Sequence, residues 1–258
     1  MTAAAQLDPR EPSDGDPRAI RTLLGVWAHP DDEAYCSSGL MGRVRDHGGR
    51  VVVVTATRGE RGTADPEAWP PERLGRLRET ELRSSLAEAD VHEHQWLSHR
   101  DGELADVSPS RGAAEIAWII EAVRPDVIVT FGPEGMTGHS DHRVISAWTT
   151  AAWRRAGARS ELWYATLTPE FHHEWGELND RVGLWTAEPP VTRSSELAAH
   201  VRLSGRHLAR KHRALRAHAS QTRTLEDLVG SETYRRWWSH EYFVAAGTAE
   251  RTIPVVVP

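Results

Sequence analysis

The sequence predicts an α/β protein with a Rossmann-like, mostly parallel sheet and helices on both of its faces. Three apolar runs carry this prediction, at residues 23–27, 51–54 and 127–129. Runs that are apolar or β-branched throughout are typical of strands buried on both faces. The segments between them have helical spacing. Strands that alternate with helices favour a parallel sheet with right-handed crossovers.

The first half of the chain is expected to alternate strands and helices up to the third apolar run. The strands are predicted at residues 23–27, 50–57 and 94–97, and the helices at 34–47, 74–89 and 113–123. Gly48 and Gly49 end the first helix, and Pro125 limits the last one. Residues 58–71 are rich in Gly and Pro and are predicted to form a loop, and residues 100–102 a turn.

The second half begins with a strand at residues 126–131 and an apolar helical stripe that includes Ile145 and Trp148. A further strand is predicted at residues 162–167. Residues 168–195 are aromatic without a clear period, and we expect them to be irregular. The last predicted elements are a strand at 197–203, a helix at 206–220 and a closing segment at 234–244.

Composition favours one ordinary globular domain. The chain has 258 residues, of which 39% are hydrophobic and 26% charged, which is usual for a soluble fold. We expect residues 1–20 to form a disordered tail and residues 21–258 a single domain. The tail has no apolar h-region, so it is not read as a signal peptide.

The net charge and the number of cysteines limit which partners and which cellular compartment are expected. The formal net charge is -6 and there is no basic tract, so nucleic acid is not an expected partner. No apolar run approaches membrane-spanning length. Cys36 is the only cysteine, which excludes an intramolecular disulfide and a cysteine-based metal cluster. A lone cysteine fits a reducing compartment, and we expect a cytoplasmic protein. An oligomer is compatible with the sequence.

The segment around which the chain is organised lies at residues 28–33 and reads AHPDDE. It follows the first predicted strand, where ligands bind in open α/β sheets. A histidine and adjacent acids are costly at such a point unless a positive charge lies among them. Zinc binds histidine nitrogen and carboxylate oxygen, and a catalytic zinc keeps a position open for water. Asp31 and Asp32 leave the turn in different directions, so one could bind metal while the other faces the water. The alternative is an N-cap acid, which explains one aspartate only.

A second histidine segment follows the strand at residues 126–131 and reads GHSDH at 138–142. His139 and His142 are three residues apart and would share a helix face at the same sheet edge. His29, Asp32 and His142 would then give three ligands and one open position, which is a hydrolytic zinc pattern. The alternative is a capped helix with two surface histidines.

The remaining polar residues of these segments would complete the chemistry. Zinc lowers the pKa of bound water and polarises a carbonyl, and Asp31 would take the proton of the water. His139 would face the oxyanion or protonate a leaving amine. Asp141 would hydrogen-bond a histidine, and beside His139 it would favour the charged imidazole.

These two segments together resemble the PIG-L/LmbE-like zinc N-deacetylases. The resemblance spans about residues 22–221 and includes TRGERG at 57–62, RETE at 78–81, RDG at 100–102 and AHASQ at 217–221. It implies an LmbE-like fold, bound Zn²⁺, and removal of an acetyl or similar acyl group from the amide nitrogen of an N-acetylglucosamine-type sugar or conjugate. It also implies the ligand set given above, Asp31 as base, and His139 as acid or oxyanion partner.

The resemblance extends to residues outside the two main segments. Arg78 and Asp101 match positions that touch sugar hydroxyls in some members, and the alternatives are a helix-surface ion pair and a turn acid. Some members have a tyrosine in the loop before the second histidine segment, but residues 134–138 have none. His218 is expected to pack near the site. Four tryptophans are candidates for lining a sugar groove: Trp69, Trp163, Trp175 and Trp185.

Three other classes of protein compete with this interpretation. A Rossmann nucleotide-binding enzyme needs a glycine-rich first turn, whereas this chain has Asp31, Asp32 and Glu33 there, which would repel phosphate. A two-metal phosphoesterase needs bridging ligands that cannot be assigned. A non-catalytic metal- or sugar-binding protein on the same scaffold would be expected to lack the base or His139, and both are present.

Overall fold

A seven-stranded sheet forms the centre of the computed structural model, which describes residues 20–247. The strand order is β3-β2-β1-β4-β5-β7-β6. The strands are β1 (Thr22–Trp27), β2 (Arg50–Thr55), β3 (Glu93–Trp96), β4 (Val127–Phe131), β5 (Glu161–Thr166), β6 (Ala199–Arg202) and β7 (His240–Ala245). Strands β1 to β5 pair in parallel, and β7 is antiparallel to β5 and β6. The predicted mostly parallel sheet is confirmed. The predicted tail lies outside the described residues, except for Ile20.

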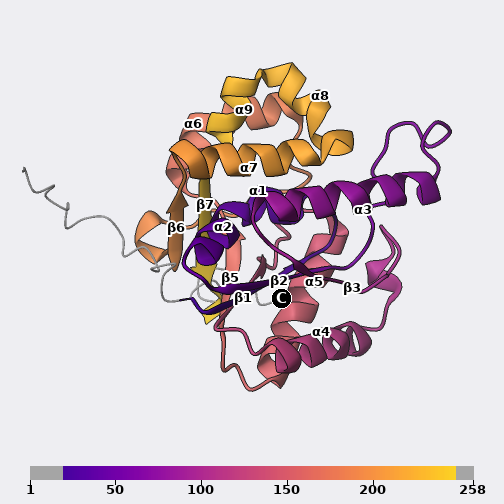
Figure 1. Cartoon of the computed structure of the whole chain (residues 1–258), viewed down its shortest axis with the longest axis vertical. Helices are drawn as coiled ribbons and strands as arrows, with labels where there is room; N and C mark the ends of the chain where they lie inside the picture. The colour runs from indigo at the N-terminus through magenta and orange to yellow at the C-terminus, as the bar shows by residue number, and fades with distance from the viewer. Residues whose placement is uncertain (1–19, 248–258) are drawn as a thin grey trace, which may run out of the picture.

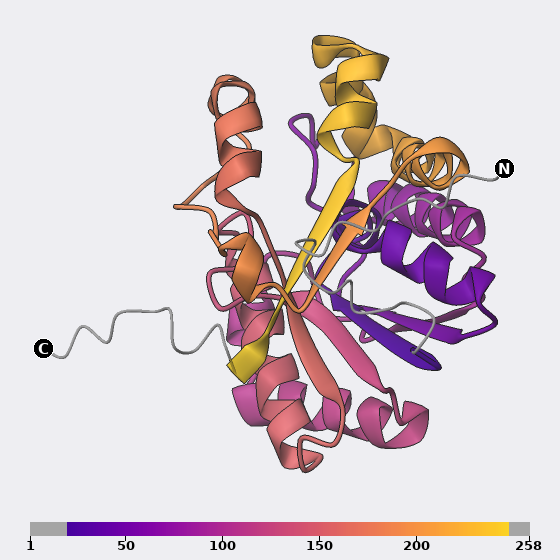
Figure 2. The same cartoon turned by 90° about the vertical axis from the view of Figure 1, so that its left-hand side faces the viewer.

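Helices cover both faces of the sheet, as predicted. They are α1 (Asp32–Cys36), α2 (Ser38–Asp46), α3 (Pro71–Glu88), α4 (Pro109–Val123), α5 (Ser140–Arg155), α6 (Pro169–Val182), α7 (Gly205–Ala217), α8 (Ala219–Val229) and α9 (Ser231–Trp237). Helices α4 and α5 lie on one face, and α1, α2, α3 and α7 on the other (Figure 1). Helices α6, α8 and α9 extend past the carboxyl ends of the parallel strands, at the top of Figure 2. None of the helices in residues 20–247 is long and apolar enough to cross a membrane.

The core consists of the apolar runs from which the sheet was predicted. Leu23, Leu24, Val53, Val54 and Val129 are fully buried. Their side chains alternate between the two faces, and helices cover both faces, so no polar position is needed along these strands. This explains why a continuous apolar run, rather than an alternating one, marks each central strand.

The helix predicted at residues 34–47 is two helices, α1 and α2, separated at Ser37. The carboxylate of Glu241, on β7, accepts hydrogen bonds from the backbone N–H groups of Gly39 (2.7 Å) and Leu40 (2.8 Å). These N–H groups lie in the first turn of α2, where they have no partner within the helix. A distant carboxylate therefore makes a new helix start inside one apolar pattern, and local periodicity does not reveal it.

The segment expected to be irregular, residues 168–195, contains α6, so that expectation is wrong. Thr168 caps the helix by accepting the Phe171 N–H, Pro169 occupies the first turn, and Gly183 ends it in a left-handed conformation. All three are known helix boundary signals. The predicted helix at 206–220 is also divided, into α7 and α8 with His218 between them. The closing segment at 234–244 contains the end of α9 and the antiparallel strand β7.

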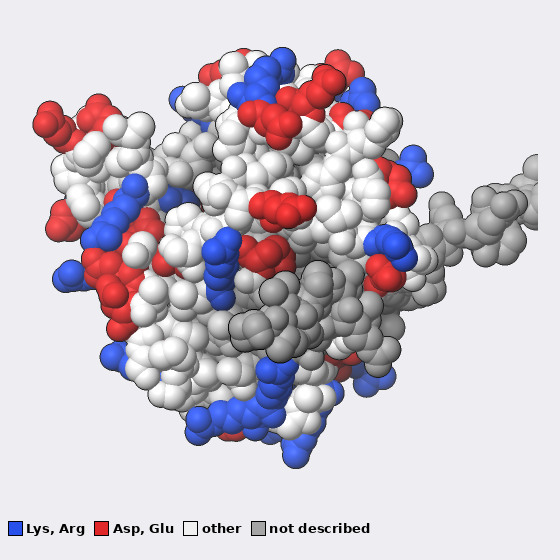
Figure 3. Space-filling model, turned by 180° about the vertical axis from the view of Figure 1, so that it is seen from behind, with Lys and Arg blue, Asp and Glu red and all other residues white. Residues whose placement is uncertain are grey.

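Charged side chains of both signs are scattered over the face seen from behind, with wide uncharged areas between them (Figure 3). Exposed ion pairs such as Arg50–Glu93, at 2.6 Å, add little stability because water screens them. One pair is different. Lys211 and Glu241 have fully buried side chains, 2.6 Å apart, and Lys211 also donates to the Tyr35 carbonyl.

Replacing Lys211 by methionine should destabilise the fold by about 3–5 kcal/mol, because Glu241 would be left as an unpaired buried charge. Urea unfolding measures the difference. The double variant Lys211→Met/Glu241→Gln should recover part of the loss, since it removes both charges. The matched surface variant Arg50→Met should cost no more than about 1 kcal/mol. Equal losses of stability for Lys211→Met and Arg50→Met would show that the buried pair contributes no more to stability than the exposed one.

Candidate metal centre and active site

A cavity of about 490 Å³ opens at the carboxyl ends of the parallel strands. Strands β1 and β4 are neighbours and run in parallel, so the segments that follow them meet at one edge. The cavity brings together most of the residues selected from the sequence: His29, Asp31, Asp32, Arg78, Asp101, His139 and His142. Two segments more than 100 residues apart in the chain thus form one site.

Candidate ligand atoms of three residues form a compact triangle within this cavity, with a different oxygen of Asp32 nearest to each histidine. His29 Nδ1 lies 3.2 Å from His142 Nε2. Asp32 Oδ1 lies 3.3 Å from His142 Nε2, and Asp32 Oδ2 lies 3.7 Å from His29 Nδ1. Zinc bonds of about 2.0–2.1 Å in a tetrahedral arrangement place ligand atoms roughly 3.3 Å apart. The spacing and the types of donor atom therefore fit a metal ion held by His29, Asp32 and His142.

The second nitrogen of each imidazole has its own partner. His29 Nε2 lies 3.2 Å from Asp101 Oδ1 and 3.3 Å from Asp141 Oδ2. His142 Nδ1 lies 3.0 Å from the Gly135 carbonyl, and its ring stacks on Phe131. An oxygen that only accepts requires an N–H at these nitrogens. In the neutral imidazoles the facing nitrogens, His29 Nδ1 and His142 Nε2, then carry the lone pairs, as in metal-binding histidines.

The electrostatics of this cluster favour a cation. Burial alone would lower the pKa of His29, but hydrogen bonds to Asp101 and Asp141 and the charge of Asp32 raise it to about 10. Burial alone would raise the pKa of Asp32, but His142 and His29 hold it below its usual range. The carboxylates therefore stabilise positive charge at the point where the three candidate ligands converge.

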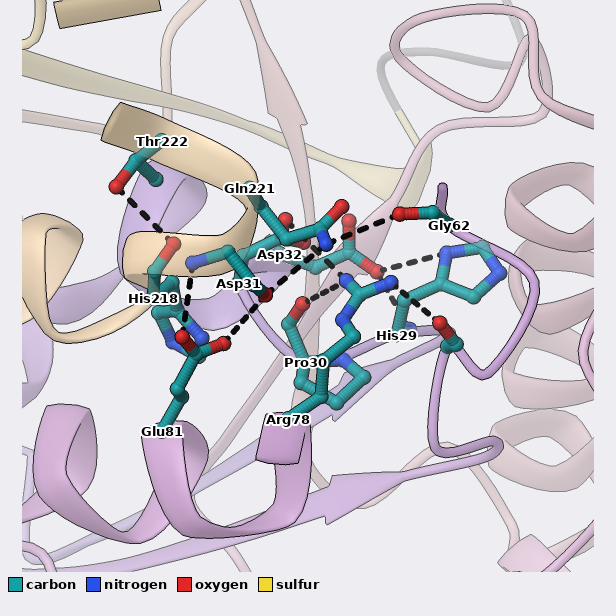
Figure 4. A network of polar contacts seen from close by, with 12 residues as sticks. His29, Pro30, Asp31, Asp32, Gly62, Arg78, Glu81, His218, Gln221 and Thr222 are labelled. Atoms are coloured by element: carbon teal, nitrogen blue, oxygen red, sulfur yellow. Dashed lines mark hydrogen bonds and ion pairs between the residues drawn. The ribbon is translucent and has the colours of Figure 1, made fainter. Parts of the chain in front are cut away.

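Asp31 lies beside the triangle rather than within it. Its Oδ2 is 3.3 Å from Arg78 Nη2 (Figure 4), and Asp31 lines the same cavity. Burial raises the pKa of Asp31 to about 6, although Arg78 opposes the shift. Asp31 has a φ of 107°, a left-handed backbone that is costly for aspartate. The two adjacent aspartates thus have different surroundings, as the sequence predicted.

Arg78 is buried beneath the turn at residues 28–33. Its guanidinium donates to the carbonyls of Gly59 (2.7 Å) and Pro30 (2.5 Å) and pairs with Asp31 (Figure 4). A Cβ at Gly59 or Gly62 would collide with this guanidinium, so replacing either glycine would displace the Arg78 side chain. The helix-surface ion pair considered for Arg78 is therefore wrong. Part of its side chain still lines the cavity.

His139 occupies the N-cap of α5 and not a position within the helix. Its Nδ1 accepts the Asp141 N–H at 3.2 Å, and its ring lies edge-on to His29 with centroids 4.8 Å apart. Burial and the neighbouring His29 and His142 lower the pKa of His139, and Asp141 opposes this only in part. The carboxylate of Asp141 contacts His29 and the Gly102 N–H instead of His139. Asp141 therefore does raise the pKa of His139, as expected, but burial and the two histidines lower that pKa by more.

Glu33 is a residue of the site to which the sequence assigned no role. It is fully buried, and its Oε2 accepts the Asp31 N–H at 3.0 Å. Its Oε1 lies 2.8 Å from Ser85 Oγ and 2.8 Å from His218 Nε2. Burial would lower the pKa of His218, but Glu33 raises it. His218 thus does more than pack near the site, because through Glu33 it supports the left-handed Asp31.

Of the four tryptophans proposed for a sugar groove, Trp185 lines the cavity. Trp163 is buried in β5, Trp175 packs near Trp237, and Trp69 lies under the Arg73 guanidinium. Trp238 also lines the cavity but was not selected from the sequence. Because tryptophan is abundant in this chain, the sequence alone could not separate the tryptophans of the core from those that line the cavity.

Comparison with known proteins identifies the family. The profile described as "PIG-L: GlcNAc-PI de-N-acetylase" matches residues 24–153, which is half of the chain. The chain belongs to the PIG-L family. The PIG-L region contains every candidate ligand and both acid–base candidates. Because the PIG-L family consists of N-deacetylases, membership identifies this chain as an amide-hydrolysing enzyme. It also confirms the resemblance found in the sequence.

A PIG-L relative from Actinosynnema mirum is 33% identical over 241 residues, covering 82% of this chain and 84% of its own. It is a 1D-myo-inositol 2-acetamido-2-deoxy-alpha-D-glucopyranoside deacetylase. Among solved structures, the N,N'-diacetylchitobiose deacetylase from Pyrococcus horikoshii has a TM-score of 0.66 at 19% identity, covering 94% of this chain and 90% of its own. At that identity the likeness shows the fold, which matches the predicted LmbE-like class.

The same fold also carries another chemistry. The 4-carboxy-2-hydroxymuconate hydratase GalB from Pseudomonas putida has a TM-score of 0.58 at 14% identity, covering 92% of this chain and 98% of its own. Function therefore has to be argued from the residues of the site and not from the fold.

Proposed function

We propose that this protein is a zinc-dependent hydrolase that removes an acetyl or similar acyl group from the amide nitrogen of an N-acetylglucosamine-type sugar or sugar conjugate. One observation carries the proposal: two imidazole nitrogens and a carboxylate converge at zinc-ligand spacing, with a second carboxylate, Asp31, beside them. The substrate class is supported by the sugar deacetylases named among the relatives.

In this proposal His29, Asp32 and His142 hold the zinc ion. When bound, zinc would lower the pKa of a water and polarise the acyl carbonyl. Asp31 takes the proton of the attacking water, and the buried Arg78 fixes the orientation of its carboxylate. Asp141 and Asp101 orient the His29 ring through Nε2.

His139 is proposed to act on the leaving side of the reaction. An amine is a poor leaving group until it is protonated, so the site needs an acid as well as a base. His139 borders the cavity next to both candidate histidine ligands and is only partly buried. It donates to the oxyanion or to the departing nitrogen. Arg78 and Asp101 also face the cavity, and we propose that they contact sugar hydroxyls there.

The test is an amine-release screen with zinc-loaded protein on N-acetylglucosamine, its glycosides and N-acetylated disaccharides. We expect stoichiometric release of acetate and a free amine from at least one of them. Saturable sugar binding without amine release would instead support the alternative, a non-catalytic metal- or sugar-binding protein. We further propose a cytoplasmic location, inferred from cysteine usage, which cell fractionation would check.

A further inference from the structure

One tyrosine that lines the cavity is held in place by residues from the distant end of the chain. Tyr35 follows Asp32 by three residues on α1. Its backbone carbonyl accepts a hydrogen bond from Lys211 Nζ at 2.6 Å, and its ring lies edge-on to Trp238 with centroids 4.7 Å apart. Its hydroxyl oxygen lies 2.8 Å from the hydroxyl oxygen of Tyr234, on α9. The Tyr35 side chain is therefore fixed from its backbone to its hydroxyl group.

The direction of the hydrogen bond between the two hydroxyl groups follows from their burial. Tyr234 is fully buried, and among residues 20–247 its hydroxyl group has no hydrogen-bond partner other than Tyr35. A buried O–H that donates to nothing would cost free energy, so Tyr234 donates and the oxygen of Tyr35 accepts. A phenol has one proton to donate. The proton of Tyr35 is then left without an acceptor in the part of the chain that the structure describes.

Of the two tyrosines, Tyr35 is the one that a ligand can reach. Tyr35 is half-buried and lines the cavity, whereas Tyr234 is not among the lining residues. Burial raises the pKa of both tyrosines, and the charge of Asp31 adds to the shift, so both hydroxyl groups stay protonated at neutral pH. A donor that is already fixed in place loses little entropy when it binds an acceptor. Tyr35 is such a donor, and its proton is unused.

The residues that fix Tyr35 lie outside the region matched by the PIG-L profile. Lys211, Tyr234 and Trp238 come after residue 153, whereas Tyr35 lies two residues after the AHPDDE segment. The position of the Tyr35 hydroxyl group thus depends on the C-terminal part of this chain as well as on the profile region. This makes Tyr35 a candidate for selecting the substrate.

We propose that the Tyr35 O–H group donates a hydrogen bond to a hydroxyl oxygen of the sugar, and that Tyr35 selects substrates by that hydroxyl group. This rests on the proposed deacetylase function and adds a substrate-binding residue to it. A sugar hydroxyl can accept this bond, whereas a sugar without that hydroxyl leaves the phenol unpaired. A site built to hydrogen-bond a hydroxyl group rejects the analogue that lacks it. A tyrosine pair with a structural role alone would not distinguish the two sugars.

The experiment measures kcat/KM for the methyl glycoside of N-acetylglucosamine and for its 3-deoxy, 4-deoxy and 6-deoxy analogues. At one position we expect removal of the hydroxyl group to lower kcat/KM of the wild type about threefold to tenfold, the usual effect of one neutral hydrogen bond. In Tyr35→Phe the same removal should have no effect, because the phenol that it left unpaired is gone. Losses that are independent of Tyr35 at all three positions would overturn the proposal.

The double variant Tyr35→Phe/Tyr234→Phe controls for a loss of stability. Tyr35→Phe alone leaves the buried Tyr234 hydroxyl group without an acceptor, whereas the double variant removes both groups. We expect the urea midpoint of Tyr35→Phe to lie below that of the double variant, and both variants to lose the sugar preference. A midpoint for Tyr35→Phe at or above that of the double variant would reverse the direction of the hydrogen bond and overturn the proposal.

Tyr242→Phe is the matched control for the sugar preference. Tyr242 is half-buried, like Tyr35, but it is not among the residues that line the main cavity. Its variant should keep the wild-type preference at the selected position. Loss of the preference in Tyr242→Phe to the same extent as in Tyr35→Phe would exclude a direct contact as its origin.

A binding measurement separates this proposal from the proposed function. Calorimetric titration with the parent glycoside and its three deoxy analogues needs no turnover. Weaker binding of one deoxy sugar to the wild type, together with equal binding of that sugar and its parent to Tyr35→Phe, would support the contact even if no amine is released. In that case the deacetylase proposal fails alone. Amine release with a sugar preference that is unchanged in Tyr35→Phe overturns the contact alone.

Discussion

Stripping the protein with a chelator should abolish deacetylation, and adding Zn²⁺ should restore it. The reason is the triangle of His29 Nδ1, His142 Nε2 and an Asp32 oxygen, which fits zinc and surrounds it with carboxylates. His29→Ala should lose both metal and turnover, and its fold should survive because β1 is buried independently of the ligand. Elemental analysis and circular dichroism measure the two outcomes.

His92→Ala is a suitable control for this experiment. His92 is an exposed histidine that pairs with Asp90 and lies outside the cavity. Its variant should keep full metal content and activity. Full turnover in protein shown to contain no metal would exclude the zinc proposal. Retention of stoichiometric zinc by His29→Ala would show that the ligand set is wrong.

Replacing Asp31 by asparagine should leave zinc in place and reduce kcat by roughly 10²–10⁴-fold, which is the usual contribution of a general base. The carboxylate of Asp31 lies beside Arg78 and outside the ligand triangle, so metal content should not depend on it. Asp32→Asn is the matched variant, one residue away, and it should lower metal content directly. Metal titration together with kcat and KM distinguishes the two.

His139→Ala extends the same comparison to the acid. It should retain zinc and lose much of its turnover, because His139 borders the cavity without entering the triangle. Loss of zinc from Asp31→Asn together with its retention in Asp32→Asn would mean that the two aspartates have the opposite roles. A zinc-loaded His139→Ala enzyme with unchanged turnover would assign the acid to another group.

The central part of the fold could be predicted because its signals are local. The apolar runs at 23–27 and 51–54 mark strands wherever they pack, and parallel strands carry their carboxyl ends to one edge. That edge brings His29 and His142 together, so the candidate site followed from the order of the elements. Helix α6 was missed although Thr168, Pro169 and Gly183 bound it, because its aromatic residues obscured the helical period.

Other features could not be read from local patterns because packing between distant segments creates them. Glu241 starts α2 from about 200 residues away in the chain. Asp141 contacts His29 instead of its near neighbour His139, since the turn at Gly102 fixes its carboxylate. Part of the cavity lining comes from α8 and from the segments that follow α6 and α9, and no short motif marks it.

The contact between Glu33 and His218 also constrains the order in which this protein can be assembled. Glu33 holds the Asp31 turn, and its buried carboxylate is paired with a histidine 185 positions later. A nascent chain that has not yet released residue 218 from the ribosome lacks this partner, even though it already contains His29, Asp32 and His142. The mature turn is therefore a late product of synthesis. Fragments that end soon after α5 contain every proposed ligand but leave the Glu33 carboxylate without its imidazole.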